Sequence, residues 1–138
     1  MNFHSPFVAG LLGLCLPAVA HAQDTCATAT PLAAGAHAAI VTDTGPLSIS
    51  GLTPSCGGTS PVDAWYSWSP DVTAAGDWHF TTCNDANYDT QLALWDACGG
   101  IELGCNDDHP SCIGFESQLF VDGLVASNTY YLQVGGFN

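Results

Sequence analysis

Acidic and amide side chains gather on either side of a short apolar hairpin in the middle of the chain. They are Asp85, Asp89, Asn106, Asp107 and Asp108. Hard cations such as calcium take roughly six to eight oxygen ligands from carboxylates, amides and backbone carbonyls. The pattern therefore predicts a calcium site. The alternative interpretation is that these residues only form turns, since Asn and Asp side chains readily hydrogen-bond to nearby backbone.

Two strands are needed to bring these side chains together. Two segments, residues 89–95 and 101–105, either alternate between apolar and polar residues or are continuously apolar. Gly99 and Gly100 lie between them and suit a tight connection. In an antiparallel hairpin the first strand begins where the second strand ends. We therefore expect both acidic groups to lie at the same end of the hairpin.

The N-terminal segment has the pattern of a secretory signal. An apolar stretch from residue 7 to residue 20 is followed by small residues at Ala20 and Ala22. We predict a signal peptide over residues 1–22 and a single domain over residues 23–138. The chain is then expected to be secreted or held at a bacterial cell surface.

Removal of that segment leaves an even number of cysteines, which in an exported chain predicts disulfides. The pairings that we favour are Cys98 with Cys105 across the hairpin, Cys83 with Cys112 beside the acidic loops, and Cys26 with Cys56 as the remainder. Sequence alone leaves the other pairings open. Zinc bound by Cys105, His109 and Cys112 is a weaker alternative, because thiols in an oxidising compartment usually form disulfides.

The charge balance excludes two classes of partner. The chain has 13 acidic residues and no Lys or Arg, for a net charge of −13. Such a surface repels nucleic-acid phosphates and anionic membranes. With no fixed cation available, a bound divalent metal would relieve carboxylate repulsion, which supports the calcium hypothesis independently.

The remaining pattern is that of an all-β protein. About eight short strands separated by turns predict an antiparallel β-sandwich of jelly-roll-like topology. We expect the strands at residues 38–42, 47–52, 62–69, 77–83, 89–95, 101–105, 116–121 and 129–134. In the strand at 62–69, Tyr66 and Trp68 alternate with Trp65 and Ser67, so one face can enter a core while the other presents an indole.

Five segments occur in an order that resembles the bacterial pre-peptidase C-terminal domain. They read DTC, DAWYSW, TTC, YDTQLALWDACGGIELGCNDD and TYYLQVGGFN. The resemblance implies a secreted jelly-roll-like module, calcium-binding in some members and without catalytic activity. Carried over by position, it implies Asp89, Asp107 and Asp108 as the main acidic ligands, with Asn106 and Asp85 after them.

The C-terminus departs from that resemblance. Members of the family continue past the Gly-Gly-aromatic-Asn turn into one more strand, whereas this sequence stops at Asn138. We expect either a fragment of a larger exported protein, which we favour, or a sandwich that lacks its last strand and so has an open edge. An open edge would allow copies to associate by strand addition.

These observations favour a noncatalytic module for display, adhesion or assembly, because the sequence shows no recognisable catalytic combination of acid, base and nucleophile. The alternative is a carbohydrate-binding module that uses exposed tryptophans. The candidates are Trp65, Trp68, Trp78 and Trp95. The expected partner is accordingly a polysaccharide or a protein at the cell surface.

Overall fold

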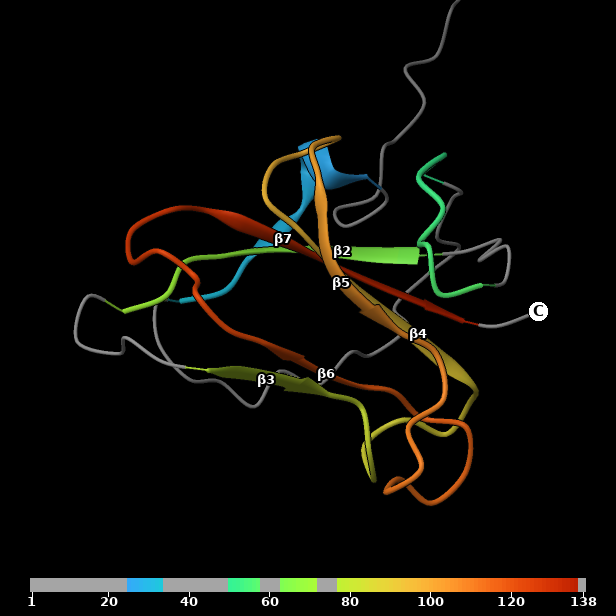
Figure 1. Ribbon diagram of the computed structural model, residues 1–138. Helices are drawn as coiled ribbons and strands as arrows, with labels where there is room; N and C mark the ends of the chain where they lie inside the picture. Colours follow the sequence, from blue (N-terminus) through green and yellow to red (C-terminus); the bar gives the residue numbers. More distant parts are fainter. Residues whose placement is uncertain (1–24, 34–49, 58–62, 72–76, 137–138) are drawn as a thin grey trace, which may run out of the picture.

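The computed structural model describes residues 25–33, 50–57, 63–71 and 77–136. Seven strands in these ranges form two sheets packed face to face (Figure 1). The strands are β1 (Thr30–Pro31), β2 (Asp63–Trp68), β3 (Trp78–Thr81), β4 (Thr90–Trp95), β5 (Glu102–Asn106), β6 (Gln118–Val121) and β7 (Tyr130–Gly136), and a short 3-10 turn, η1 (Cys26–Thr28), precedes them. Among the described residues, no helix is long and apolar enough to cross a membrane.

The larger sheet has the strand order β1-β2-β7-β4-β5, and the smaller sheet pairs β3 with β6. Every pairing is antiparallel except that of β1 with β2. The chain passes from the larger to the smaller sheet between β2 and β3 and returns between β3 and β4. It enters the smaller sheet again at β6 and returns to the larger sheet at β7. The expected all-β, jelly-roll-like sandwich is therefore confirmed.

The expected strands from residue 62 onward are all present, with ends that differ by a few residues. The strand expected at 38–42, most of that at 47–52 and the signal segment at 1–22 lie outside the described residues. Residues 50–52 do not form a strand, and β1 was not anticipated from the sequence.

The last strand is not at an edge of the sheet. Strand β7 pairs with β2 through Leu132 and Tyr66, and with β4 through Val134 and Leu92. An open edge therefore does not lie at β7, and the further strand expected after Asn138 stays a prediction. Sequence order suggested a terminal strand, whereas the topology places β7 between two partners.

The main core lies between the two sheets. Alternate residues of β2, β4 and β7, among them Tyr66, Trp68 and Leu94, pack against the inner face of β3 and β6. The Trp68 ring meets the rings of Trp78 and Phe80 edge to face at centroid distances of 4.5 and 5.5 Å. Such aromatic contacts stabilise a core beyond the area that they bury.

The outer face of the larger sheet is also buried. Trp65, Ala93 and Trp95 form a second cluster there, packed against Ala29 and Leu52 among others. We call residues 25–33 and 50–57, which supply this covering, the N-terminal cover. Since Trp65, Trp68 and Trp95 are buried and Trp78 is half-buried, none of the four is exposed in the way that the carbohydrate-binding alternative required.

A buried polar network attaches the N-terminal cover to the sheet. The Gln133 Nε2 group donates to Asp63 Oδ2 at 2.6 Å and to the Leu52 carbonyl at 2.9 Å. Its Oε1 accepts from Trp95 Nε1 at 3.1 Å, and Asp63 Oδ1 accepts from the Ser50 backbone N–H at 3.2 Å. The side chains of Asp63 and Gln133 on this buried face therefore bond to the cover instead of water.

Two disulfides hold the same cover, and they differ from the pairs that we favoured. Cys26 is joined to Cys98 and Cys56 to Cys105, with Cα separations of 5.3 and 5.6 Å. The expected pairs Cys98–Cys105 and Cys26–Cys56 were wrong. Cys105 lies opposite Ala93 in the hairpin, whereas Cys98 lies in the turn beyond Trp95. At about 3.3 Å per residue, that offset exceeds the reach of a disulfide.

Candidate functional site

The hairpin brings three carboxylates together at one end of the larger sheet. Asp89 immediately precedes β4, while Asp107 and Asp108 immediately follow β5. One oxygen from each of the three lies within 4.8 Å of the others. We call Asp89, Asp107 and Asp108 the acidic cluster. Their convergence follows from the antiparallel pairing of β4 with β5, as the sequence suggested.

The other two predicted ligands have different surroundings. Asp85 is exposed in the loop between β3 and β4 and is not part of the acidic cluster. Asn106 accepts the Gln118 backbone N–H at its Oδ1 at 2.8 Å and donates to the Asp108 carbonyl at 3.4 Å. Asn106 therefore connects the loop after β5 to β6, and so positions the cluster.

A buried network of hydroxyl groups, which the sequence did not lead us to predict, contacts the backbone of the acidic cluster. Thr82 Oγ1 and Thr90 Oγ1 lie 2.6 Å apart, and both accept the Ser117 backbone N–H at 3.0 Å. The Ser117 hydroxyl in turn contacts the carbonyls of Thr90 and Asp107. The signal that could have revealed it is a Ser or Thr beside the end of β3, at the start of β4 and before β6.

The Cys83–Cys112 disulfide ties the loop after β3 to the loop before β6, with a Cα separation of 5.1 Å. This is the pair that we expected beside the acidic loops. Cys105 and Cys112 therefore belong to separate disulfides, which overturns the zinc alternative.

The acidic cluster is electrostatically strained. The Oδ1 atoms of Asp89 and Asp107 are buried and have no hydrogen-bond partner among the described residues. Burial raises the pKa of both carboxyls above their ordinary value of 3.8, and the neighbouring charge of Asp108 raises it further. The charge of Asp89 adds to the effect on Asp107. Each ionised carboxylate in the cluster therefore lacks the positive partner that would stabilise it.

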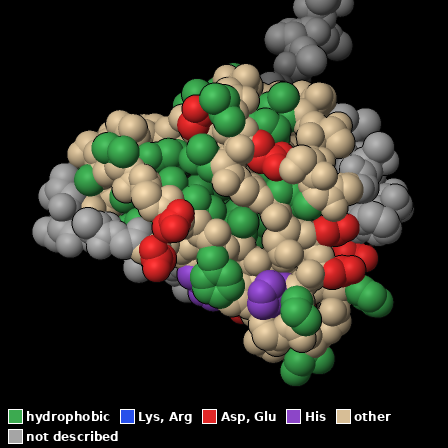
Figure 2. Space-filling model, viewed as in Figure 1, with side chains coloured by type: hydrophobic (Ala, Val, Ile, Leu, Met, Phe, Trp, Pro, Cys, Tyr) green, Lys and Arg blue, Asp and Glu red, His purple; other side chains and the backbone are tan. Residues whose placement is uncertain are grey.

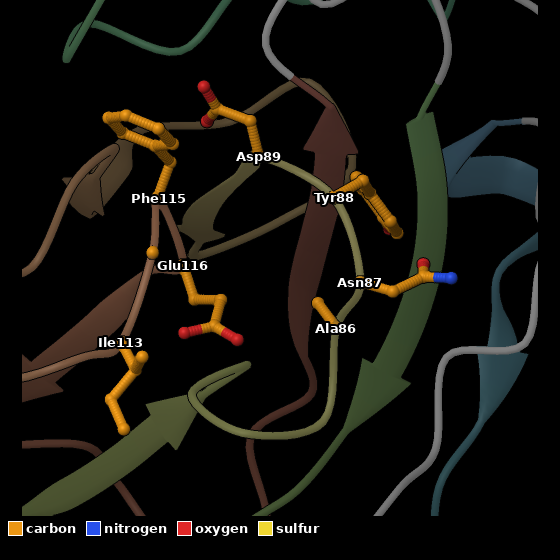
Figure 3. Close-up of a pocket in the computed structure, with 8 residues that line it drawn as sticks. Ala86, Asn87, Tyr88, Asp89, Ile113, Phe115 and Glu116 are labelled. Atoms are coloured by element: carbon orange, nitrogen blue, oxygen red, sulfur yellow. The ribbon is translucent and has the colours of Figure 1, made fainter.

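A hollow of about 350 Å³ lies beside the acidic cluster. Its walls come from the loop before β4, including Asn87 and Tyr88, and from the loop before β6, including Phe115 and Glu116. Figure 3 shows the Glu116 carboxylate pointing into this space, whereas the Asp89 carboxylate points away from it. The hollow and the acidic cluster are thus neighbouring sites that share the backbone at Asp89.

Comparison with known proteins identifies one relationship. No significant match was found among curated proteins or among solved structures. The model of a family described as galactose binding domain-like and T9SS-associated matches residues 22–137. The more specific likeness to pre-peptidase C-terminal domains stays a prediction. Families of this kind are generally noncatalytic binding modules, and the T9SS association indicates an exported protein of the cell surface. Since the match spans most of the sequence, the chain belongs to this T9SS-associated, galactose binding domain-like family.

Proposed function

We propose that this chain is a noncatalytic, calcium-stabilised module through which an exported protein is displayed, adheres or assembles at the cell surface. The observation that supports the proposal is the acidic cluster, where three carboxylates converge and two of their oxygens are buried without partners. An accessory role of this kind is also what the likeness to pre-peptidase C-terminal domains implies.

The donor set suits calcium better than other metals. All three side chains offer oxygen, which hard cations prefer, and the cluster contains no thiolate or imidazole. Calcium tolerates irregular coordination and completes its shell with backbone carbonyls or water, whereas magnesium requires near-octahedral geometry. A chain without Lys or Arg also has no side-chain ammonium or guanidinium to compensate the cluster.

Calcium is expected to raise the melting temperature of chelated protein. At a concentration about 100 times the Kd, binding to the folded state adds about 2.7 kcal/mol, which shifts Tm by roughly 10 °C in a domain of this size. Asp107→Asn should abolish the shift, while the exposed control Asp122→Asn should retain it. Differential scanning calorimetry with EDTA and then excess calcium measures both variants.

The pH dependence in EDTA provides a second readout of the same experiment. A carboxyl whose pKa is raised by folding destabilises the folded state once the pH exceeds its unfolded pKa. The free energy of unfolding is therefore expected to fall as the pH rises from 3.8 through the raised pKa values of Asp89 and Asp107. Asp107→Asn should show a smaller fall. A wild-type Tm that does not change on addition of calcium at any pH would refute the proposal.

Polysaccharide binding is the second candidate, and the galactose binding domain-like family supports it. With the tryptophans buried, the aromatic surface would instead be the outer face of β3 and β6. There the half-exposed Phe120 ring stacks on His79 at 4.5 Å, with His109 at 6.1 Å. Histidine and hydrophobic side chains lie close together on this face (Figure 2). Calorimetric titration with a panel of polysaccharides, compared between wild type and Phe120→Ala, tests this candidate.

A further inference from the structure

Glu116 is a buried carboxylate that lacks a donor. Its side chain is 7% exposed, and it lies in the loop that leads into β6. Oε1 accepts the Asn84 backbone N–H at 3.3 Å, but Oε2 has no hydrogen-bond partner among the described residues. A buried charged acceptor without a partner is costly, so a donor is expected to complete this site.

The chain has no Lys or Arg side chain to supply that donor. Gly114 lies beside this oxygen, since a Cβ atom built there would be 3.9 Å from Oε2, in ordinary van der Waals contact. Figure 3 shows the carboxylate directed between Ala86 and Ile113, two other residues that line the hollow.

The walls of the hollow favour a positively charged group. Tyr88 and Phe115 are among its lining residues and are 42% and 65% exposed. Aromatic faces attract ammonium and guanidinium groups. The Tyr88 ring lies 3.6 Å from the Cβ position of Gly136, so the backbone of β7 supports this wall. The net charge of −13 adds a long-range attraction for cations.

We propose that this hollow binds a cationic side chain, lysine or arginine, presented by a partner protein. The ammonium or guanidinium donates to Glu116 Oε2, and its alkyl stem lies between Tyr88 and Phe115. Ile113, which is 83% exposed at the rim, offers apolar contact to the partner around the anchored side chain. This site goes beyond the proposed calcium function and does not depend on it.

The test uses the full chain and three small probes, Nα-acetyl-lysine amide, Nα-acetyl-arginine amide and the uncharged Nα-acetyl-norleucine amide. Titration is followed by NMR chemical shifts in EDTA. We expect one or both cationic probes to bind and the norleucine probe not to bind. Glu116→Gln is expected to weaken binding about tenfold, because a hydrogen bond to a charged group is lost. Asp122→Asn removes the same charge at an exposed position and should leave binding within about twofold.

Phe115→Ala provides a variant that does not disturb a buried residue, and it should weaken binding about threefold. It carries the test if Glu116→Gln does not fold. Equal binding of the norleucine probe, or equal weakening by Asp122→Asn, would overturn the proposal. The proposal would also be overturned if calcium or methyl galactoside bound in a way that depends on Glu116 while neither cationic probe bound. Because the titration is run in EDTA, loss of the calcium effect on Tm would leave this result unaffected.

Discussion

Replacing Trp65 with alanine is expected to reduce the free energy of unfolding by about 3–5 kcal/mol, the range for large aromatic truncations in cores. Trp65 has no exposed surface and packs beside Trp95, with ring centroids 6.3 Å apart. The N-terminal cover prevents water from filling the space that the variant would leave. A loss of that size is a large fraction of the stability of an ordinary domain.

Urea unfolding followed by circular dichroism measures this effect. Phe115→Ala is the aromatic control, because its ring is largely exposed and its removal should change stability by only about 0.5 kcal/mol. A Trp65→Ala variant as stable as Phe115→Ala would show that the outer face of the larger sheet is not a packed core.

Removing the Cys26–Cys98 disulfide by double substitution with alanine is expected to cost about 4 kcal/mol. The two cysteines are 72 residues apart in sequence, and the entropy of closing so long a loop in the unfolded chain gives this value. The loss should also loosen the N-terminal cover over Trp65 and Trp95. Tryptophan emission should then shift to longer wavelength, and quenching by acrylamide should increase.

The matched control removes the Cys83–Cys112 disulfide, which lies beside the acidic cluster and away from the cover. That variant should also lose stability, yet its tryptophan emission should keep the wild-type maximum. Identical emission from the two double variants would contradict the role assigned to Cys26–Cys98.

The sequence was sufficient to predict the sandwich and the convergence of Asp89 with Asp107 and Asp108. Both depend on local information, since alternation marks the strands and a hairpin fixes which of its ends meet. The ligand role predicted for Asn106 could not be separated from its structural role, because its bond to Gln118 arises only when β5 packs beside β6.

The burial of Trp65 and the cysteine pairing lay beyond sequence reasoning for a common reason. Alternation in β2 indicates two faces but does not show what covers the second one. The cover comes from residues far away in sequence, which are held by Cys26 and Cys56. Until that segment is placed on the sheet, nothing specifies Cys98 and Cys105 as its anchors.

The position of β7 has a consequence for how this exported protein matures. Strand β7, the last in sequence among the described strands, occupies the middle of the larger sheet, where it joins β2 to β4. Before β7 emerges, the earlier strands of that sheet lack the neighbour that unites them, so the sheet cannot assemble during synthesis. The order of its strands thus delays completion of the larger sheet until residue 136 is available.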